Sequence, residues 1–180
     1  MLKCRIDASP ESLTKLHTKY PWIPSGSDVR PSVNVLTQKT KDMSQVMFFY
    51  ESLRDYLLED IFGISTEINA NGKCFVRKLP ASFFELDSNL RENKYPYQVS
   101  DKTQHYVLWY PMFSREATLS DSQITRDIIR HLIFISGRLD LNFVWYINPK
   151  MTITDLFHVQ VFVHQGSNMV MSDNLSDKNI

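Results

Sequence analysis

Glycine is scarce in this chain, with 5 residues among 180. A phosphate-binding loop that needs several closely spaced glycines is therefore excluded. Cysteine is scarcer still, because Cys4 and Cys74 are the two in the sequence and they lie far apart. This pattern is neither a disulfide framework nor a zinc signature, and it suits a reducing compartment.

The chain also lacks net charge, since Lys+Arg and Asp+Glu both number 20. A large, unspecific nucleic-acid surface needs an excess of positive charge, so that class is disfavoured. No apolar run approaches the ~18 residues of a membrane span, and the N-terminal residues contain no apolar signal-peptide segment. We expect a cytoplasmic protein without membrane contact or, if it is viral, a protein of the host cytoplasm or nucleus.

What the chain does contain is typical of a globular protein, with 43% hydrophobic and 22% charged residues. Its length suits one domain that spans residues 1–180 and buries a full core. Within it we expect a mostly helical or irregular N-terminal part (1–68), an αβ core (73–164) and a flexible tail (166–180).

Two helices are predicted in the N-terminal part. The first has Ser9 as its cap and Pro10 at its first position, and it runs to about Lys19. The second is capped by Asp42 or Ser44 and ends at Gly63. Its apolar residues recur at helical spacing, namely Val46, Phe49, Leu53, Tyr56, Leu57 and Ile61.

The αβ core combines one long helix with strands. Ser120 and Gln123 form a capping box for a helix over 120–136, and Gly137 ends it. We expect its buried stripe to comprise Ile124, Ile128, Leu132 and Ile135. Strands are expected at 73–79, 105–110, 142–148 and 156–164, and the last two form an antiparallel pair under the helix. These elements predict an α+β fold with an antiparallel sheet and packed helices.

The last strand, "LFHVQVFVH" at 156–164, alternates cleanly. Residues two apart share a face of a strand, so the apolar set should face the core: Phe157, Val159, Val161 and Val163. We expect the other face to be exposed, and it carries His158 and Gln160. An imidazole is a competent nucleophile for phosphorus, and an amide can donate a hydrogen bond to a phosphoryl oxygen.

The order of these elements resembles the histidine-triad superfamily of nucleotide hydrolases and transferases. In that family a strand with His and Pro leads into a long helix, and a strand ending in Asn and a phosphate loop precede a strand that reads His-φ-His-φ-His. The resemblance covers residues 73–164. It implies that His158 is the nucleophile and that Gln160 holds the phosphoryl group, as in the branch that reads His-x-His-x-Gln.

The resemblance also implies a role for residues around that strand. Asn148, Thr152 and Thr154 would cradle phosphate and sugar, and the mechanism requires no metal ion and no cofactor. The sequence departs from the family pattern in two places. Leu156 stands where the first histidine belongs, and the family's Gly-Gln-Ser/Thr phosphate loop is replaced by "KMTITD".

The chain further resembles a little-studied family found in fungi and large DNA viruses. The shared motifs are Tyr-Pro-Tyr at 95–97, "HYVLW" at 105–109, Trp145, Asn-Pro at 148–149 and Phe-His-Val at 157–159. That family implies no established activity.

Four more residues are candidates for a site. His105 opens a strand beside the His158 strand and would assist by orienting phosphate or protonating a leaving group, or it is a histidine satisfied by a loop carbonyl. Trp109 and Trp145 would stack on a base, or they are core residues. Lys150 would supply positive charge for phosphate.

Different functions therefore stay open. The first is a nucleotide phosphoanhydride hydrolase or nucleotidyltransferase with a histidine nucleophile. The second is a catalytically inactive histidine-triad-like module that binds a nucleotide-like molecule or a protein. The third is a viral factor that interacts with host proteins. The oligomeric state is open, and a homodimer is one option.

Overall fold

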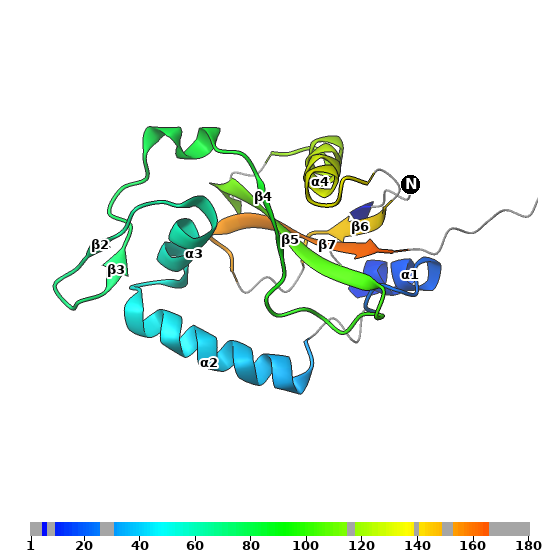
Figure 1. The fold of residues 1–180 in the computed structure, drawn as a ribbon, viewed down its shortest axis with the longest axis horizontal. Coiled ribbons are helices and arrows are strands. Elements are labelled where there is room, and N and C mark those ends of the chain that lie inside the picture. Colours follow the sequence, from blue (N-terminus) through cyan, green and yellow to red (C-terminus); the bar gives the residue numbers. More distant parts are fainter. Residues whose placement is uncertain are drawn as a thin grey trace, which may run out of the picture.

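The computed structural model describes residues 5–6, 10–25, 31–114, 118–138, 141–148 and 153–165, with side chains from residue 15 onward. Its main sheet has five strands in the order β1-β6-β7-β5-β4, and helices lie on both sides of it (Figure 1). β1 (Arg5–Ile6) is parallel to β6 (Asn142–Tyr146). The other neighbours are antiparallel, namely β7 (Leu156–His164), β5 (Thr103–Phe113) and β4 (Asn89–Glu92). The expected α+β fold class is confirmed.

One face of the sheet is covered by α4 (Asp121–Ser136). The helix begins with the expected capping box of Ser120 and Gln123 and ends at Gly137, whose φ of 66° a glycine adopts without strain. Its buried residues pack against the apolar set of β7 and against β5 and β6. The expected stripe is correct for Ile124, Ile128 and Leu132 and wrong for Ile135, which is exposed.

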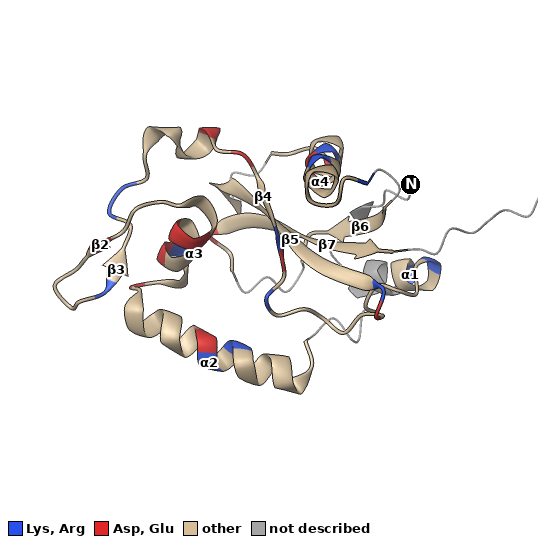
Figure 2. Ribbon diagram, viewed as in Figure 1, with Lys and Arg blue, Asp and Glu red and all other residues tan. Residues whose placement is uncertain are grey.

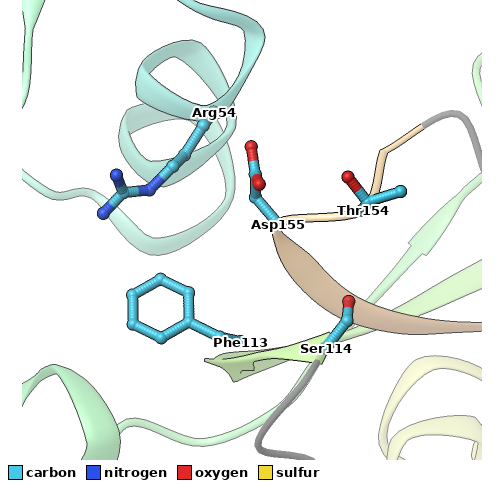
Figure 3. A pocket seen from close by; sticks show the side chains of 5 residues that line it. All are labelled: Arg54, Phe113, Ser114, Thr154 and Asp155. Carbon is cyan, nitrogen blue, oxygen red and sulfur yellow. The ribbon is translucent and has the colours of Figure 1, made fainter.

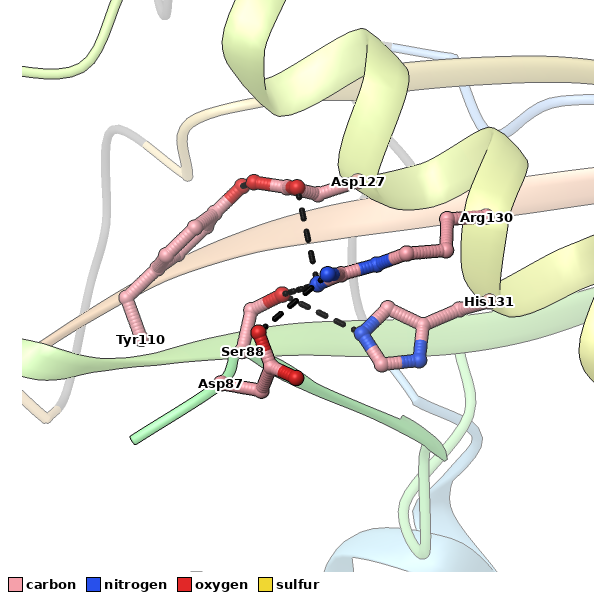
Figure 4. Close-up of polar contacts among 6 residues, drawn as sticks. All are labelled: Asp87, Ser88, Tyr110, Asp127, Arg130 and His131. Atoms are coloured by element: carbon pink, nitrogen blue, oxygen red, sulfur yellow. Dashed lines mark hydrogen bonds and ion pairs between the residues drawn. The ribbon is translucent and has the colours of Figure 1, made fainter. Parts of the chain in front are cut away.

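A polar network also ties α4 to the sheet edge (Figure 4). The guanidinium of Arg130 lies 3.2 Å from a carboxylate oxygen of Asp87 and 3.6 Å from one of Asp127. The same Asp127 accepts a hydrogen bond from the Tyr110 hydroxyl at 3.1 Å. The residues of this network come from the segment before β4, from β5 and from α4, so polar contacts as well as apolar packing connect the helix to the sheet.

The N-terminal helices differ from the prediction. α1 (Pro10–Lys19) has the expected bounds. The single helix expected from Asp42 or Ser44 to Gly63 is wrong, because α2 (Val33–Phe49) and α3 (Leu53–Phe62) are separate helices. The Ser32 side chain caps α2 and Ser52 caps α3. Between them Tyr50 pairs with Cys74, and the amide of Glu51 donates to the carbonyl of Cys74 at 2.9 Å. This long-range pairing breaks the helix.

The second face of the sheet is buried too. Residues of α1 and the segment after it, Leu16, Tyr20 and Ile23, pack against β6 and β7. Residues of α3, Leu57, Leu58 and Ile61, pack against β5 and the start of β7. The expectation of an exposed second face on β7 is therefore wrong, since His158 and Gln160 are 4% and 5% exposed.

Three expected strands have different bounds in the structure, and the first of them is β6, which ends at Tyr146 and not at Asn148. The strand expected at 73–79 is limited to β3 (Cys74–Phe75), which pairs with β2 (Glu67–Ile68), and η1 (Ala81–Glu85) follows it. Pro111 does not end the strand that begins at Thr103. It falls within a register shift between Trp109 and Phe113, where an amide donor is not needed. Among the described residues, no helix is long and apolar enough to cross a membrane.

Candidate functional site

His105 and Gln160 come together on the second face of the sheet. They lie on the neighbouring strands β5 and β7, and Nε2 of His105 is 2.6 Å from Oε1 of Gln160. The backbone amide of Tyr97 donates to Nδ1 of the same ring at 3.1 Å. Because Nδ1 accepts, Nε2 carries the proton and donates to Gln160. The imidazole is therefore held as one neutral tautomer.

Burial strengthens that assignment. It lowers the pKa of His105 to about 4, and the hydrogen bond to Gln160 offsets only part of this effect. The ring also lies against Phe162, with 4.3 Å between the centroids and 25° between the planes. At neutral pH His105 is thus uncharged.

His158 shares the second face but has different partners. Its Nδ1 is 2.9 Å from the carbonyl oxygen of Leu156, so Nδ1–H donates and Nε2 keeps a lone pair. The ring stacks on Trp109, with centroids 4.5 Å apart. Burial lowers its pKa, and the bond to the Leu156 carbonyl opposes that shift. Among the described residues, no hydrogen bond joins His158 to His105 or Gln160.

The other predicted site residues lie in four different places. Asn148 belongs to the same neighbourhood, since its amide donates to the Tyr97 hydroxyl at 3.0 Å. Trp145 lies on the opposite face, fully buried beneath α4, and its Nε1 donates to Thr125. Thr154 is exposed at the lead-in to β7. Thr152 and Lys150 lie outside the described residues.

A pocket of about 390 Å³ lies next to Thr154, at the end of β7 that begins with Leu156. It is lined by Arg54, Phe113, Ser114, Thr154 and Asp155 (Figure 3). Sequence reasoning found only Thr154 of this set. Arg54 is one polar position on a helix, and its partners lie about 60 and 100 residues further along the chain. No local pattern connects them.

The described residues hold no group of three or more His, Cys, Asp or Glu side chains that could bind a metal ion. Comparison with models of protein families gives no match. Comparison with curated protein sequences gives none either. A solved structure described as "Crystal Structure of HTC1" is similar over 87% of this chain and 84% of that chain, with a TM-score of 0.47 and 13% sequence identity.

Proposed function

We propose that this protein is a non-catalytic binding module whose partner is a protein that docks on α2. The observation that carries the proposal is the exposure of this helix. None of the 17 residues of α2 is buried, although the helix contains several large apolar side chains. Val33 is 77% exposed, Phe48 72% and Phe49 60%. Several large apolar side chains exposed on one helix mark a candidate interaction site.

The spacing of the apolar residues suggests the shape of the partner. An exposed or half-exposed row, which we call the α2 seam, follows alternating steps of three and four residues: Val33, Leu36, Thr40, Met43 and Met47. This is the spacing that presents one seam to a second helix. Figure 2 shows that most of the α2 ribbon carries no charge, which suits a largely apolar contact.

The packing of His105, Gln160 and Trp145 supports a binding role rather than catalysis. The Gln160 carbonyl oxygen accepts from His105, His105 is neutral, and Trp145 is packed on the far side of the sheet. Three of the side chains expected to handle a nucleotide are therefore engaged inside the protein.

The proposal is tested with two matched double variants. Leu36→Glu/Met47→Glu places two charges in the α2 seam. Asn34→Glu/Gln45→Glu places two charges with the same separation on another side of the helix, at exposed positions. Quantitative enrichment of bound proteins from expressing cells, followed by cross-linking from position 40, which neither variant changes, should give partners that the seam variant loses and the control retains.

The oligomeric state is measured in the same variants by sedimentation equilibrium. A wild-type dimer that only the seam variant dissociates would make the partner a second copy of the chain. Equal partner sets and equal oligomeric states for all three proteins would contradict the proposal.

A second function is favoured by the tautomer of His158. A neutral imidazole with a free lone pair on Nε2 is the form that attacks phosphorus, and both the Leu156 carbonyl and the lowered pKa favour it. Its test is turnover of dinucleoside polyphosphates and nucleoside phosphoramidates. Turnover that is lost in His158→Ala and kept in the control His164→Ala supports a histidine nucleophile. Equal or absent turnover in wild type and His158→Ala rejects it.

A further inference from the structure

The pocket beside α3 brings together side chains from three separate segments. Arg54 comes from the first turn of α3, Phe113 and Ser114 from the end of β5, and Thr154 and Asp155 from the lead-in to β7. In Figure 3, Arg54 and Phe113 stand on one side of the space and Ser114 and Thr154 on the other. Its volume, about 390 Å³, lies within the range of roughly 300–1,000 Å³ that is usual for small-molecule sites.

Two residues that line this pocket each have a buried polar atom without a hydrogen-bond partner among the described residues. These atoms are Nε of Arg54 and the hydroxyl oxygen of Ser114. Leaving a buried polar group unpaired costs about 1–3 kcal/mol, so such groups are rare and indicate a missing partner. Arginine only donates hydrogen bonds, and a serine hydroxyl can donate to the same acceptor. Each atom could donate to an acceptor on a ligand in the pocket.

The guanidinium of Arg54 is already held in place. It lies over the ring of Phe113, with 5.3 Å between Cζ and the ring centroid. Stacking of this kind restricts the side chain before a ligand arrives, which lowers the entropic cost of binding. The remaining surface of Phe113 offers an apolar contact next to the charged group.

Asp155 decides which oxyanion suits the pocket. Asp155 lines the same space, and the ion pairs of the described residues do not include one between Asp155 and Arg54. A phosphate with two negative charges would be repelled by this carboxylate. A ligand with one negative and one positive group would meet Arg54 at one end and Asp155 at the other.

We propose that this pocket binds a small zwitterion that carries a carboxylate and an ammonium group, of which a free α-amino acid is the simplest case. The carboxylate accepts from the guanidinium of Arg54, on the side of the space that Arg54 shares with Phe113. The ammonium donates to Asp155 and to the exposed hydroxyl of Thr154. The rest of the ligand lies along the Phe113 ring. The site is separate from the α2 seam, so either proposal stands or falls without the other.

The test is calorimetric titration of the full chain with a panel of α-amino acids that differ in their side chains. For the best binder, the amide that lacks the carboxylate and the N-acetyl form that lacks the ammonium are titrated in parallel, together with inorganic phosphate. Removal of a charge-assisted hydrogen bond should weaken binding by about tenfold or more. Both blocked forms should therefore bind at least about tenfold more weakly than the free amino acid.

Variants connect the binding to the named residues. Arg54→Gln should weaken the free amino acid and its N-acetyl form alike, because both contain the carboxylate. Asp155→Asn should weaken the free amino acid and leave the N-acetyl form unchanged. Arg77→Gln is the matched control, since Arg77 is an exposed arginine that pairs with Glu67 away from the pocket. Unfolding temperatures without ligand verify that the variants are folded.

The titrations have results that support the proposal and results that overturn it. Saturable binding with the expected dependence on both charged ends supports the proposal. Binding of inorganic phosphate as tight as that of any amino acid would overturn the zwitterion assignment. Absence of saturation for the whole panel up to millimolar concentration, or binding that Arg54→Gln leaves unchanged, would overturn the site itself.

Discussion

The ring of His105 and the side chain of Gln160 meet across two neighbouring strands, with 2.6 Å between Nε2 and Oε1. Both residues are almost fully buried, and the Tyr97 amide holds the other ring nitrogen. This pair is a buried polar contact on a face of the sheet that is otherwise largely apolar. Such a contact stabilises the fold only while both members are present.

Replacement of Gln160 by leucine should therefore destabilise the protein. The change leaves the buried Nε2–H of His105 without an acceptor, and we expect the free energy of unfolding to fall by about 1–3 kcal/mol. Urea denaturation measures this loss. Gln104→Leu is the control, because Gln104 is an exposed residue of the same strand as His105 and its change should stay within about 0.5 kcal/mol. Equal effects of the two substitutions would show that the buried contact contributes nothing.

Acid should destabilise the protein through His105. Burial lowers the pKa of this ring from 6.5 to about 4. Between these values the unfolded chain takes up a proton there and the folded chain does not, so stability is lost as the pH falls from 6.5 towards 4. Below 4 both states are protonated and the loss from this group stops. Linkage over that interval amounts to about 3 kcal/mol.

The variant His105→Gln isolates this contribution. Urea denaturation of wild type and variant at about pH 7 and about pH 4.5 should show a loss on acidification that is about 2–3 kcal/mol smaller in the variant. Burial also lowers the pKa of His158 and His131, so some loss should remain in both proteins. The same loss in both would show that His105 does not titrate in this way.

Sequence reasoning succeeded where the signal was local. The capping box, the terminal glycine and most of the buried stripe of α4 were all correct, because each depends on residues within one helix. The core face of β7 was correct for the same reason. The break between α2 and α3 was missed, because the apolar spacing continues across it and the pairing of Tyr50 with Cys74 comes from a distant segment.

The prediction of the candidate site was also correct for local signals and incomplete for contacts between distant segments. Alternation along β7 grouped His158 and Gln160 on one face, but it could not show that α1 and α3 cover that face. The bond between His105 and Gln160 joins residues 55 positions apart. The pocket around Arg54 joins three such segments. Contacts that involve long separations in the chain leave no periodic trace in a single sequence.

Removal of the Tyr146 hydroxyl should stabilise the protein. The side chain is fully buried and stacked on Phe162, and its hydroxyl has no hydrogen-bond partner among the described residues. Tyr146→Phe removes an unsatisfied polar atom, so we expect the free energy of unfolding to rise by about 1 kcal/mol. Tyr110→Phe is the opposite case, because that hydroxyl donates to Asp127, and it should cost about 1 kcal/mol. In thermal and urea denaturation, the changes in the free energy of unfolding of the two variants should therefore have opposite signs. A loss of stability in Tyr146→Phe would contradict the conclusion that the Tyr146 hydroxyl is unpaired.

The buried position of Leu156 determines the effect of placing a histidine there, as the histidine-triad pattern would have. Leu156 is fully buried in an apolar cluster with Leu58, Phe83 and Trp109. A histidine placed there loses apolar packing and buries a ring that needs polar partners, so Leu156→His should lower the free energy of unfolding by about 3 kcal/mol. Leu156→Met conserves the volume and should cost less than about 1.5 kcal/mol. We also expect Leu156→His to show no turnover of dinucleoside polyphosphates, because its surroundings are packed for a leucine. A histidine variant that is as stable as wild type, or one that gains turnover, would instead favour the histidine nucleophile over the binding module.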